Sequence, residues 1–358
     1  AGVFRERWDG GYGGGIRSGL AIADECAKTS MSVSLGTSLH CEVFCSVLDG
    51  ARSKSAISDL FEQALAGSIV GCVGSTEPQG GSDLSSIQTT AIRSGDMPGS
   101  WAISGTKWFT SNGSIATHAA ILANVQDGQG SGSGPTVFVV PMDMPGVTRL
   151  CVEPTMGVVG CETSGIRLDL VGLPDDLRIG RVGLGLLTIS KALQMERLVG
   201  AWQVIAIAKR ASQLAASFMR DRSQFGGALV AKQALRHRMA EARTKLLAVE
   251  CLIDKVSAEI EAGRSVGHET AATKLLASRV AAQVVDDALQ MAGGRGYLEA
   301  FPFERWLRDV RLARIGGGTD EVMMDIVARE LDTPDPFFDE WMDKLNAMNL
   351  FAIPGKLD

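Results

Sequence analysis

The chain has 358 residues, of which 45% are hydrophobic and 21% charged, and its formal net charge is −6. These values are typical of a globular protein long enough for two or three packed units, and the negative charge argues against a general role in nucleic-acid binding. No apolar run reaches the length of a membrane-spanning helix, so no membrane span is expected.

The seven cysteines are scattered and form no CxxC pair. An odd number of such thiols is typical of a reducing compartment, so a cytoplasmic location is expected. The four histidines show no HExxH-like spacing. Because zinc sites gather such ligands at close spacing, the sequence predicts no metal site.

Proline divides the sequence into three parts. Residues 1–77 contain none, seven prolines lie from Pro78 to Pro174, and the next is Pro302. Long proline-free stretches rich in Ala, Leu, Gln, Glu, Arg and Met are typical of long helices. After a glycine-rich turn at Gly10–Gly15, the first part predicts helices near 16–27, 31–49 and 53–65.

The middle part consists of short apolar segments bounded by Gly, Ser, Asp or Pro, which are typical of strands in a compact β unit. The predicted strands are Ile69–Val73, Gln88–Ile92, Trp101–Ser104, Ala119–Ala123, Thr136–Val140 and Gly165–Leu170. The Gly/Ser-rich stretch Asp127–Pro135 is predicted to be a hairpin loop between strands.

From Gly183 the pattern becomes helical again. The predicted helices are 183–220, 231–262, 266–292, 319–331 and a short one near 337–347. A β unit inserted between two helical blocks predicts an α+β fold. Its expected domains are residues 1–70, 71–180 and 181–358.

Two glycine clusters lie in the stretch Gln290–Glu330: Gly293-Gly294 and 316–318. Glycine lets a backbone approach a ligand closely or turn with positive φ. The second cluster leads through Thr319 into a helical pattern, so the free N–H groups of a helix N-terminus could face an anion there. A tight turn capped by Thr319 explains the same residues equally well.

Two further motifs combine polar groups with close backbone approach. In Ser75–Asp83, STEPQGGSD, hydroxyls and backbone N–H groups can converge on a polar ligand edge or a pyrophosphate, although the Walker lysine and the GxGxxG spacing are absent. In Gly105–Gly113, GTKWFTSNG, Trp108 and Phe109 precede hydroxyls. This order suits stacking on a flat ring, and it also suits a strand whose aromatics fill a core.

Together these motifs resemble the acyl-CoA dehydrogenase flavoprotein family. TEPxxGSD, GxKxxxSN, RxxFGxxLxxxQ at Arg222–Gln233, QxxGGxGY at Gln290–Tyr297, then RD and GGT occur in this order. The match runs from about Gly10 to Glu330. It implies an α-helical N-terminal domain, a middle β-barrel domain and a C-terminal four-helix bundle, with one family helix apparently absent before the first residues.

The resemblance implies an FAD site. Thr76 would hydrogen-bond the flavin pyrimidine edge with Ser75 beside it, and Ser82 would lie along the FAD and thioester channel. Phe109 would pack on the flavin ring and Ser111 would bond near N5. The dinucleotide part of FAD would be bound by residues of a neighbouring subunit: Arg222, Phe225 and Gln233, with Gln290, Gly293 and Gly294 completing the pyrophosphate site. Thr319 and Glu321 would cap the dinucleotide within their own subunit. A shared FAD site implies a homotetramer, a dimer of dimers.

The implied reaction is α,β-dehydrogenation of an acyl thioester: a carboxylate removes the α-proton while the β-hydride passes to flavin N5. Many members carry this glutamate directly before the Gly-Thr pair. Here that position is Gly317, whose N–H could still polarise the thioester carbonyl, with Gly316 beside it. Relatives similar to the isovaleryl- and long-chain enzymes place the glutamate in a motif resembling LxxERL. This makes Glu196 the candidate base and Arg197 its brace, whereas a surface glutamate or structural ion pair is the alternative.

The resemblance leaves three points open. The thioester could be carried by CoA or by an acyl or peptidyl carrier protein, and the triple glycine, which omits a frequent aromatic, favours a branched or cyclic acyl group. The electron acceptor could be an electron-transferring flavoprotein or oxygen. A non-catalytic structural subunit of a paralogous dehydrogenase is the alternative from another functional class.

Overall fold

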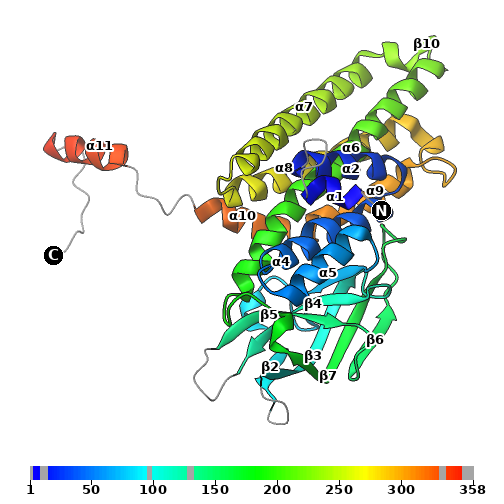
Figure 1. The fold of residues 1–358 in the computed structure, drawn as a ribbon. Coiled ribbons are helices and arrows are strands. Elements are labelled where there is room, and N and C mark those ends of the chain that lie inside the picture. Colours follow the sequence, from blue (N-terminus) through cyan, green and yellow to red (C-terminus); the bar gives the residue numbers. More distant parts are fainter. Residues whose placement is uncertain (1–2, 9–14, 95–98, 127–132, 330–335, 349–358) are drawn as a thin grey trace.

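The computed structural model describes residues 3–8, 15–94, 99–126, 133–329 and 336–348 (Figure 1). Helices come first along the chain. They are α1 (Val3–Trp8), α2 (Ile16–Thr29), α3 (Met31–Ser38), the π-helical segment η2 (Leu39–Phe44), α4 (Cys45–Asp49) and α5 (Ser55–Ala66).

The middle of the chain forms an eight-stranded sheet. Its strands are β1 (Gly71–Gly74), β2 (Thr90–Arg93), β3 (Ser100–Ser111), β4 (His118–Val125), β5 (Gly134–Pro141), β6 (Val147–Val152), β7 (Thr163–Pro174) and β8 (Arg178–Ile179). The order is β6-β7-β3-β2-β4-β5-β8, and β1 pairs with β4. The β1–β4 and β2–β4 pairs are parallel, whereas β3–β7 and β4–β5 are antiparallel.

Strand β4 shows how this sheet is held against the helices. Ala120 and Leu122 on one face pack in a cluster with Phe44 and Phe61 of the helical block. Ile121 on the other face belongs to a second cluster formed by strand residues. Because successive side chains of a strand point to opposite faces, a strand buried on both faces is apolar almost throughout, as β4 is.

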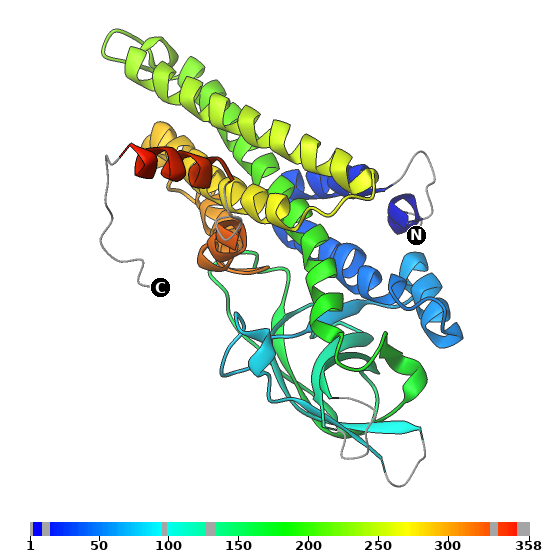
Figure 2. The same cartoon turned by 90° about the vertical axis from the view of Figure 1, so that its left-hand side faces the viewer.

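The third part is a helical bundle with a small β-hairpin. Its elements are α6 (Gly185–Asp221), β9 (Ser223–Gln224), β10 (Gly227–Ala228), α7 (Gln233–Glu261), α8 (Gly267–Ala292), α9 (Phe303–Arg311) and α10 (Asp320–Ala328), and α11 (Pro336–Ala347) follows in the sequence. Figure 2 shows the green helix α6 running from the sheet at one end of the molecule into the bundle at the other.

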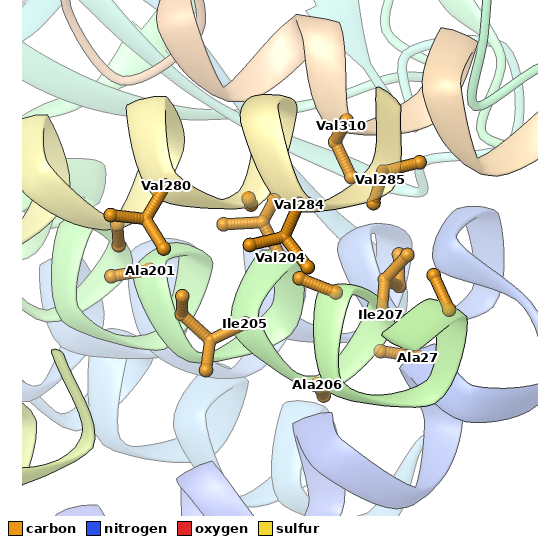
Figure 3. Packing of buried hydrophobic residues seen from close by; sticks show 14 of the residues in the cluster. Ala27, Ala201, Val204, Ile205, Ala206, Ile207, Val280, Val284, Val285 and Val310 are labelled. Atoms are coloured by element: carbon orange, nitrogen blue, oxygen red, sulfur yellow. The ribbon is translucent and has the colours of Figure 1, made fainter. Parts of the chain in front are cut away.

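Helix α6 is buried on all sides near its middle. Ala201, Val204 and Ile207 face Val280 and Val284 of α8 in the core (Figure 3). A helix that is apolar all round must be enclosed by neighbours. Since α6 also begins at the sheet, it is the element that can carry a side chain from the bundle to the boundary with the β unit.

One helical segment among the described residues, Met31–Asp49, is long and apolar enough to cross a membrane, and 61% of its apolar window is buried within the protein. This segment qualifies the expectation that no apolar run reaches that length. It contributes Val43, Phe44 and Leu48 to the core beneath the sheet, and the core helix of a globular unit passes the same test of length and composition.

The predicted helices correspond closely to α2, α5, α6, α7, α8 and α11. The strand predictions were incomplete, and the short strands β8, β9 and β10 were not predicted. Strand β3 runs on through GTKWFTS to Ser111, well beyond Trp101–Ser104. Strand β6 was also missed; it lies at the sheet edge and its residues are largely exposed.

Some expectations fall partly or wholly outside the described residues. The turn Gly10–Gly15 is described only at Gly15, and most of the loop Asp127–Pro135 is outside the described part, although its flanking strands β4 and β5 do pair antiparallel. The division into domains at residues 70 and 180 stays a prediction.

Candidate active site

Glu196 lies in the fourth turn of α6, on the half of that helix nearer the sheet. Its Oε2 is buried and accepts no hydrogen bond from the described residues. Burial raises the pKa of this carboxyl above its ordinary value, and the charges of Lys274 and Arg197 oppose the shift. A buried carboxylate oxygen that accepts no hydrogen bond is costly. The environment of Glu196 therefore suits a proton acceptor better than it suits a member of a structural ion pair.

Gly317 lies directly against this carboxyl. A Cβ atom added at Gly317 would stand 2.3 Å from Glu196 Oε2, and φ at Gly317 is 66°. The space that a side chain at 317 would need is therefore occupied by the glutamate from α6. The structure thus brings together the two positions at which the sequence motifs allow the base.

Two cationic side chains donate hydrogen bonds to carbonyl groups of the glycine turn. Arg197 Nε donates to Gly317 O at 3.0 Å, and Lys274 Nζ of α8 donates to Gly318 O. Both side chains are buried, at 8% and 4% exposure. The bracing expected of Arg197 thus has a specific contact, and Lys274 was not predicted. A lysine in the buried stripe of α8 stands out only once its burial is known, because lysines are rarely buried without a partner.

Thr319 caps helix α10, and its hydroxyl accepts a hydrogen bond from Val322 N at 3.3 Å. The capped turn predicted from the sequence is therefore present, while the role of Thr319 at a dinucleotide stays a prediction. The neighbouring Asp320 is buried and paired with Arg314 and Arg279. Glu321 is exposed.

The two polar motifs of the β unit, Ser75–Asp83 and Gly105–Gly113, are joined to one another by hydrogen bonds. Trp108 N donates to Thr76 O at 2.9 Å, and the buried Lys107 Nζ donates to Glu77 Oε1 at 2.6 Å. Glu77 also accepts from the backbone N–H groups of Gln88 and Thr89, at 2.7 and 2.9 Å. This Glu77–Lys107 pair, which the sequence analysis did not identify, fixes the loop that carries Ser75 and Thr76.

The two aromatics of the second motif differ in environment. Trp108 packs against Gly165, where an added Cβ would be 2.7 Å from the indole ring. Phe109 is 65% exposed and adopts a positive φ of 51°. A core-filling role for Phe109 is therefore wrong, because a residue that is 65% exposed lies outside the core. Ser111 ends β3 half-buried, and Ser82 is exposed.

The residues expected at the dinucleotide lie elsewhere. Arg222 follows the end of α6, roughly 40 Å along the helix from Glu196 at about 1.5 Å per residue, and Phe225 is 92% exposed at the tip of the β9–β10 hairpin. Gln233 begins α7. Gln290, Gly293 and Gly294 are exposed at the end of α8. Arg222 and Phe225 therefore lie far from the Glu196 of their own chain.

The Glu77–Lys107 pair predicts a clear effect on stability. Burial alone would raise the pKa of Glu77, but hydrogen bonds from Lys107, Thr89 and Gln88 outweigh it and lower the pKa to about 2. Lys107→Met leaves a buried carboxylate without its cation and is expected to lower the free energy of unfolding by about 3–5 kcal/mol. Urea unfolding at neutral pH measures the loss.

The matched control is Lys245→Met, which removes a surface pair with Glu241 and is expected to cost less than about 1 kcal/mol. A group with a lowered folded-state pKa stabilises the protein above its unfolded pKa, which for Glu77 is near the ordinary value of 4.5. The contribution is then lost as pH falls from there toward about 2. Equal losses in the two variants would contradict the assignment of a buried pair.

A carboxylate on a bundle helix packed against a glycine turn is the arrangement expected from the resemblance to dehydrogenases of acyl thioesters. Comparison with known proteins extends this. The family models described as "Acyl-CoA dehydrogenase, middle domain" and "Acyl-CoA dehydrogenase, C-terminal domain" match residues 72–171 and 183–331. The chain therefore belongs to the acyl-CoA dehydrogenase family.

Individual relatives cover most of the chain. An acyl-[acyl-carrier-protein] dehydrogenase, MbtN, of Mycolicibacterium paratuberculosis is 33% identical over 91% of this chain and 83% of its own length. Benzylmalonyl-CoA dehydrogenase of Aromatoleum aromaticum is 31% identical over 93% and 87%. The solved structure of butyryl-CoA dehydrogenase from Megasphaera elsdenii superposes with a TM-score of 0.87 at 27% identity, covering 93% of this chain and 88% of that one.

Proposed function

We propose that this protein is an FAD-dependent dehydrogenase of acyl thioesters in which Glu196 removes the α-proton. The observation that carries the proposal is the Glu196 carboxyl, whose buried Oε2 has no hydrogen-bond partner and lies where a side chain at Gly317 would be. The family to which the chain belongs supports the reaction type.

The residues of the β unit fit a flavin. Phe109 presents an exposed ring at positive φ, next to a loop held by the Trp108–Thr76 hydrogen bond. An exposed aromatic ring beside hydroxyls and free backbone groups can cover one face of a planar heterocycle and bond its edge. Thr76, Ser75 and Ser111 would hold that edge. When bound, FAD supplies the acceptor for the β-hydride.

Proton removal is the task of the chain's own residues. The α-proton of a thioester is weakly acidic, so the site must strengthen the base and stabilise the developing enolate. Burial raises the pKa of Glu196 and so strengthens it as a base. The Gly317 N–H, in a turn held by Arg197, would donate to the thioester carbonyl as negative charge develops there.

The thioester could be carried by CoA or by a carrier protein, and the names of the two curated relatives support both. An anaerobic test with purified holoprotein separates them: bleaching of the flavin absorbance is followed with a panel of straight, branched and cyclic acyl-CoA esters and with the same acyl groups on a carrier protein. We expect bleaching by at least one panel. Failure of both panels with a flavin-loaded protein would contradict the proposed function.

A homotetramer is the oligomer we propose, supported by Phe225 and Tyr297, which are 92% and 79% exposed beside the residues expected at the dinucleotide. Large exposed aromatics of this kind suit burial against a partner. Light scattering of the holoprotein tests the mass of the oligomer.

The electron acceptor we propose is an electron-transferring flavoprotein, and fast reoxidation of the reduced flavin in air would identify oxygen instead. The cytoplasmic location stays a proposal, supported by the seven unpaired cysteines.

The alternative role as a non-catalytic subunit predicts a protein that purifies without flavin. The unpartnered Glu196 carboxyl argues against it, because a protein without a reaction to perform gains nothing from a buried carboxylate that lacks a donor. A colourless protein that takes up no added FAD would favour that role.

A further inference from the structure

Lys274 on α8 is a buried lysine that none of the sequence motifs includes. It is 4% exposed, and its Nζ donates a hydrogen bond to the carbonyl of Gly318. Arg197 of α6 donates to the carbonyl of Gly317, the preceding residue. Two cations from different helices therefore bind consecutive carbonyls of the glycine turn.

The turn needs such support because its backbone is unusual. Gly317 and Gly318 have φ values of 66° and 103°, both in the region that favours glycine. Glycine is also the residue with the most backbone freedom to lose on ordering. Cationic donors on both carbonyls limit that freedom and keep Gly317 against the Glu196 carboxyl.

Among the ionisable groups around Lys274, Glu196 is the one whose ionisation its charge affects most. The ionisable groups that act on it are Glu196 and Arg197 from α6, and Asp320 and Glu321 from α10. Asp320 already accepts from Arg314 and Arg279, and Glu321 is exposed to solvent. Glu196, whose Oε2 has no donor, is the acid that depends most on the charge of Lys274.

We propose that Lys274 is a positioning residue that keeps Glu196 ionised and holds the Gly318 carbonyl, and thereby sets the pH range in which the base works. The inference rests on the proposed function of Glu196. Burial lowers the pKa of Lys274 to about 8, so at neutral pH and below the amine carries its proton. The positive charge of Lys274 favours the carboxylate of Glu196 over the carboxylic acid.

The test compares Lys274→Met, Lys274→Arg and Lys191→Met in the full-length holoprotein. Methionine keeps the length of the side chain without its charge, arginine keeps the charge, and Lys191 is an exposed lysine of α6. Two quantities are measured against pH: the anaerobic rate of flavin bleaching by a thioester, and the infrared band of the protonated Glu196 carboxyl, assigned by its loss in Glu196→Gln. The infrared titration does not depend on turnover.

In Lys274→Met we expect the carboxyl to titrate at higher pH, with bleaching about tenfold slower on the acidic side and recovering as pH rises. Lys274→Arg and Lys191→Met should follow the unmodified protein. A carboxyl titration unmoved in folded Lys274→Met, or a loss of rate equal at every pH, would overturn the proposal. Normal bleaching by Glu196→Gln would instead reject Glu196 as the base, with the infrared result unaffected.

Discussion

Glu196→Gln is expected to slow flavin bleaching by an acyl thioester by roughly 10²–10⁴-fold, the range that a positioned general base contributes. Glutamine has nearly the same shape as glutamate but cannot accept the α-proton. The bound FAD should remain, because Glu196 is not among the residues expected to hold it. Anaerobic stopped-flow absorbance measures the rate, and the flavin spectrum measures cofactor content.

A matched control is Glu241→Gln, which makes the same chemical change at an exposed residue of α7. It should bleach at the rate of the unmodified protein. If the flavin of Glu196→Gln were also bleached at that rate, the base would have to be another group. The buried, unpartnered carboxyl oxygen of Glu196 would then need a structural explanation.

The same substitution should separate catalysis from stability. The Glu196 carboxyl is buried with a partnerless oxygen, and burial raises its pKa. A group with a raised folded-state pKa destabilises the fold in its ionised form. We therefore expect Glu196→Gln to unfold at equal or higher urea concentration at neutral pH, with the advantage fading as pH falls and the glutamate is protonated in both states. A clear loss of stability would indicate that Glu196 has a structural role.

Much of this site could be predicted from the sequence because its parts lie in short motifs. The glycine at 317 and the glutamate at 196 are each visible locally, and glycine at one base position directs attention to the other. The Thr319 cap follows from its place before an apolar helical pattern. What a motif shows is which residue types are present and in what order.

The remaining contacts join residues that only the fold brings together. Lys107 reaches Glu77 across 30 positions of sequence, and Lys274 reaches Gly318 across 44. Their formation depends on strand register and on how α6 and α8 pack, neither of which is encoded in a short pattern. A lone buried lysine gives a signal only once its burial is known, so these two cations became visible only in the structure.

Gly317→Ala is expected to have the second large effect, lowering the bleaching rate about 10²-fold, as a displacement of about 1 Å at a catalytic group can do. The new Cβ would stand 2.3 Å from Glu196 Oε2, so the carboxyl must move. Alanine at a φ of 66° also adds about 1–2 kcal/mol of backbone strain. Stopped-flow bleaching and urea unfolding measure the two consequences separately.

Gly67→Ala isolates the backbone part of this effect, because Gly67 has a φ of 72° and nothing within 4 Å of an added Cβ. It should lose stability alone. The collision itself is tested by adding Gly317→Ala to Glu196→Ala: with the carboxyl gone, the glycine substitution should cost about as much stability as Gly67→Ala. The difference between the two backgrounds is then the coupling between Glu196 and Gly317, expected at about 0.5–3 kcal/mol for residues in contact. A coupling near zero would mean that the carboxyl does not occupy the space beside Gly317. It would then be wrong that the Glu196 side chain fills the place of a side chain at position 317.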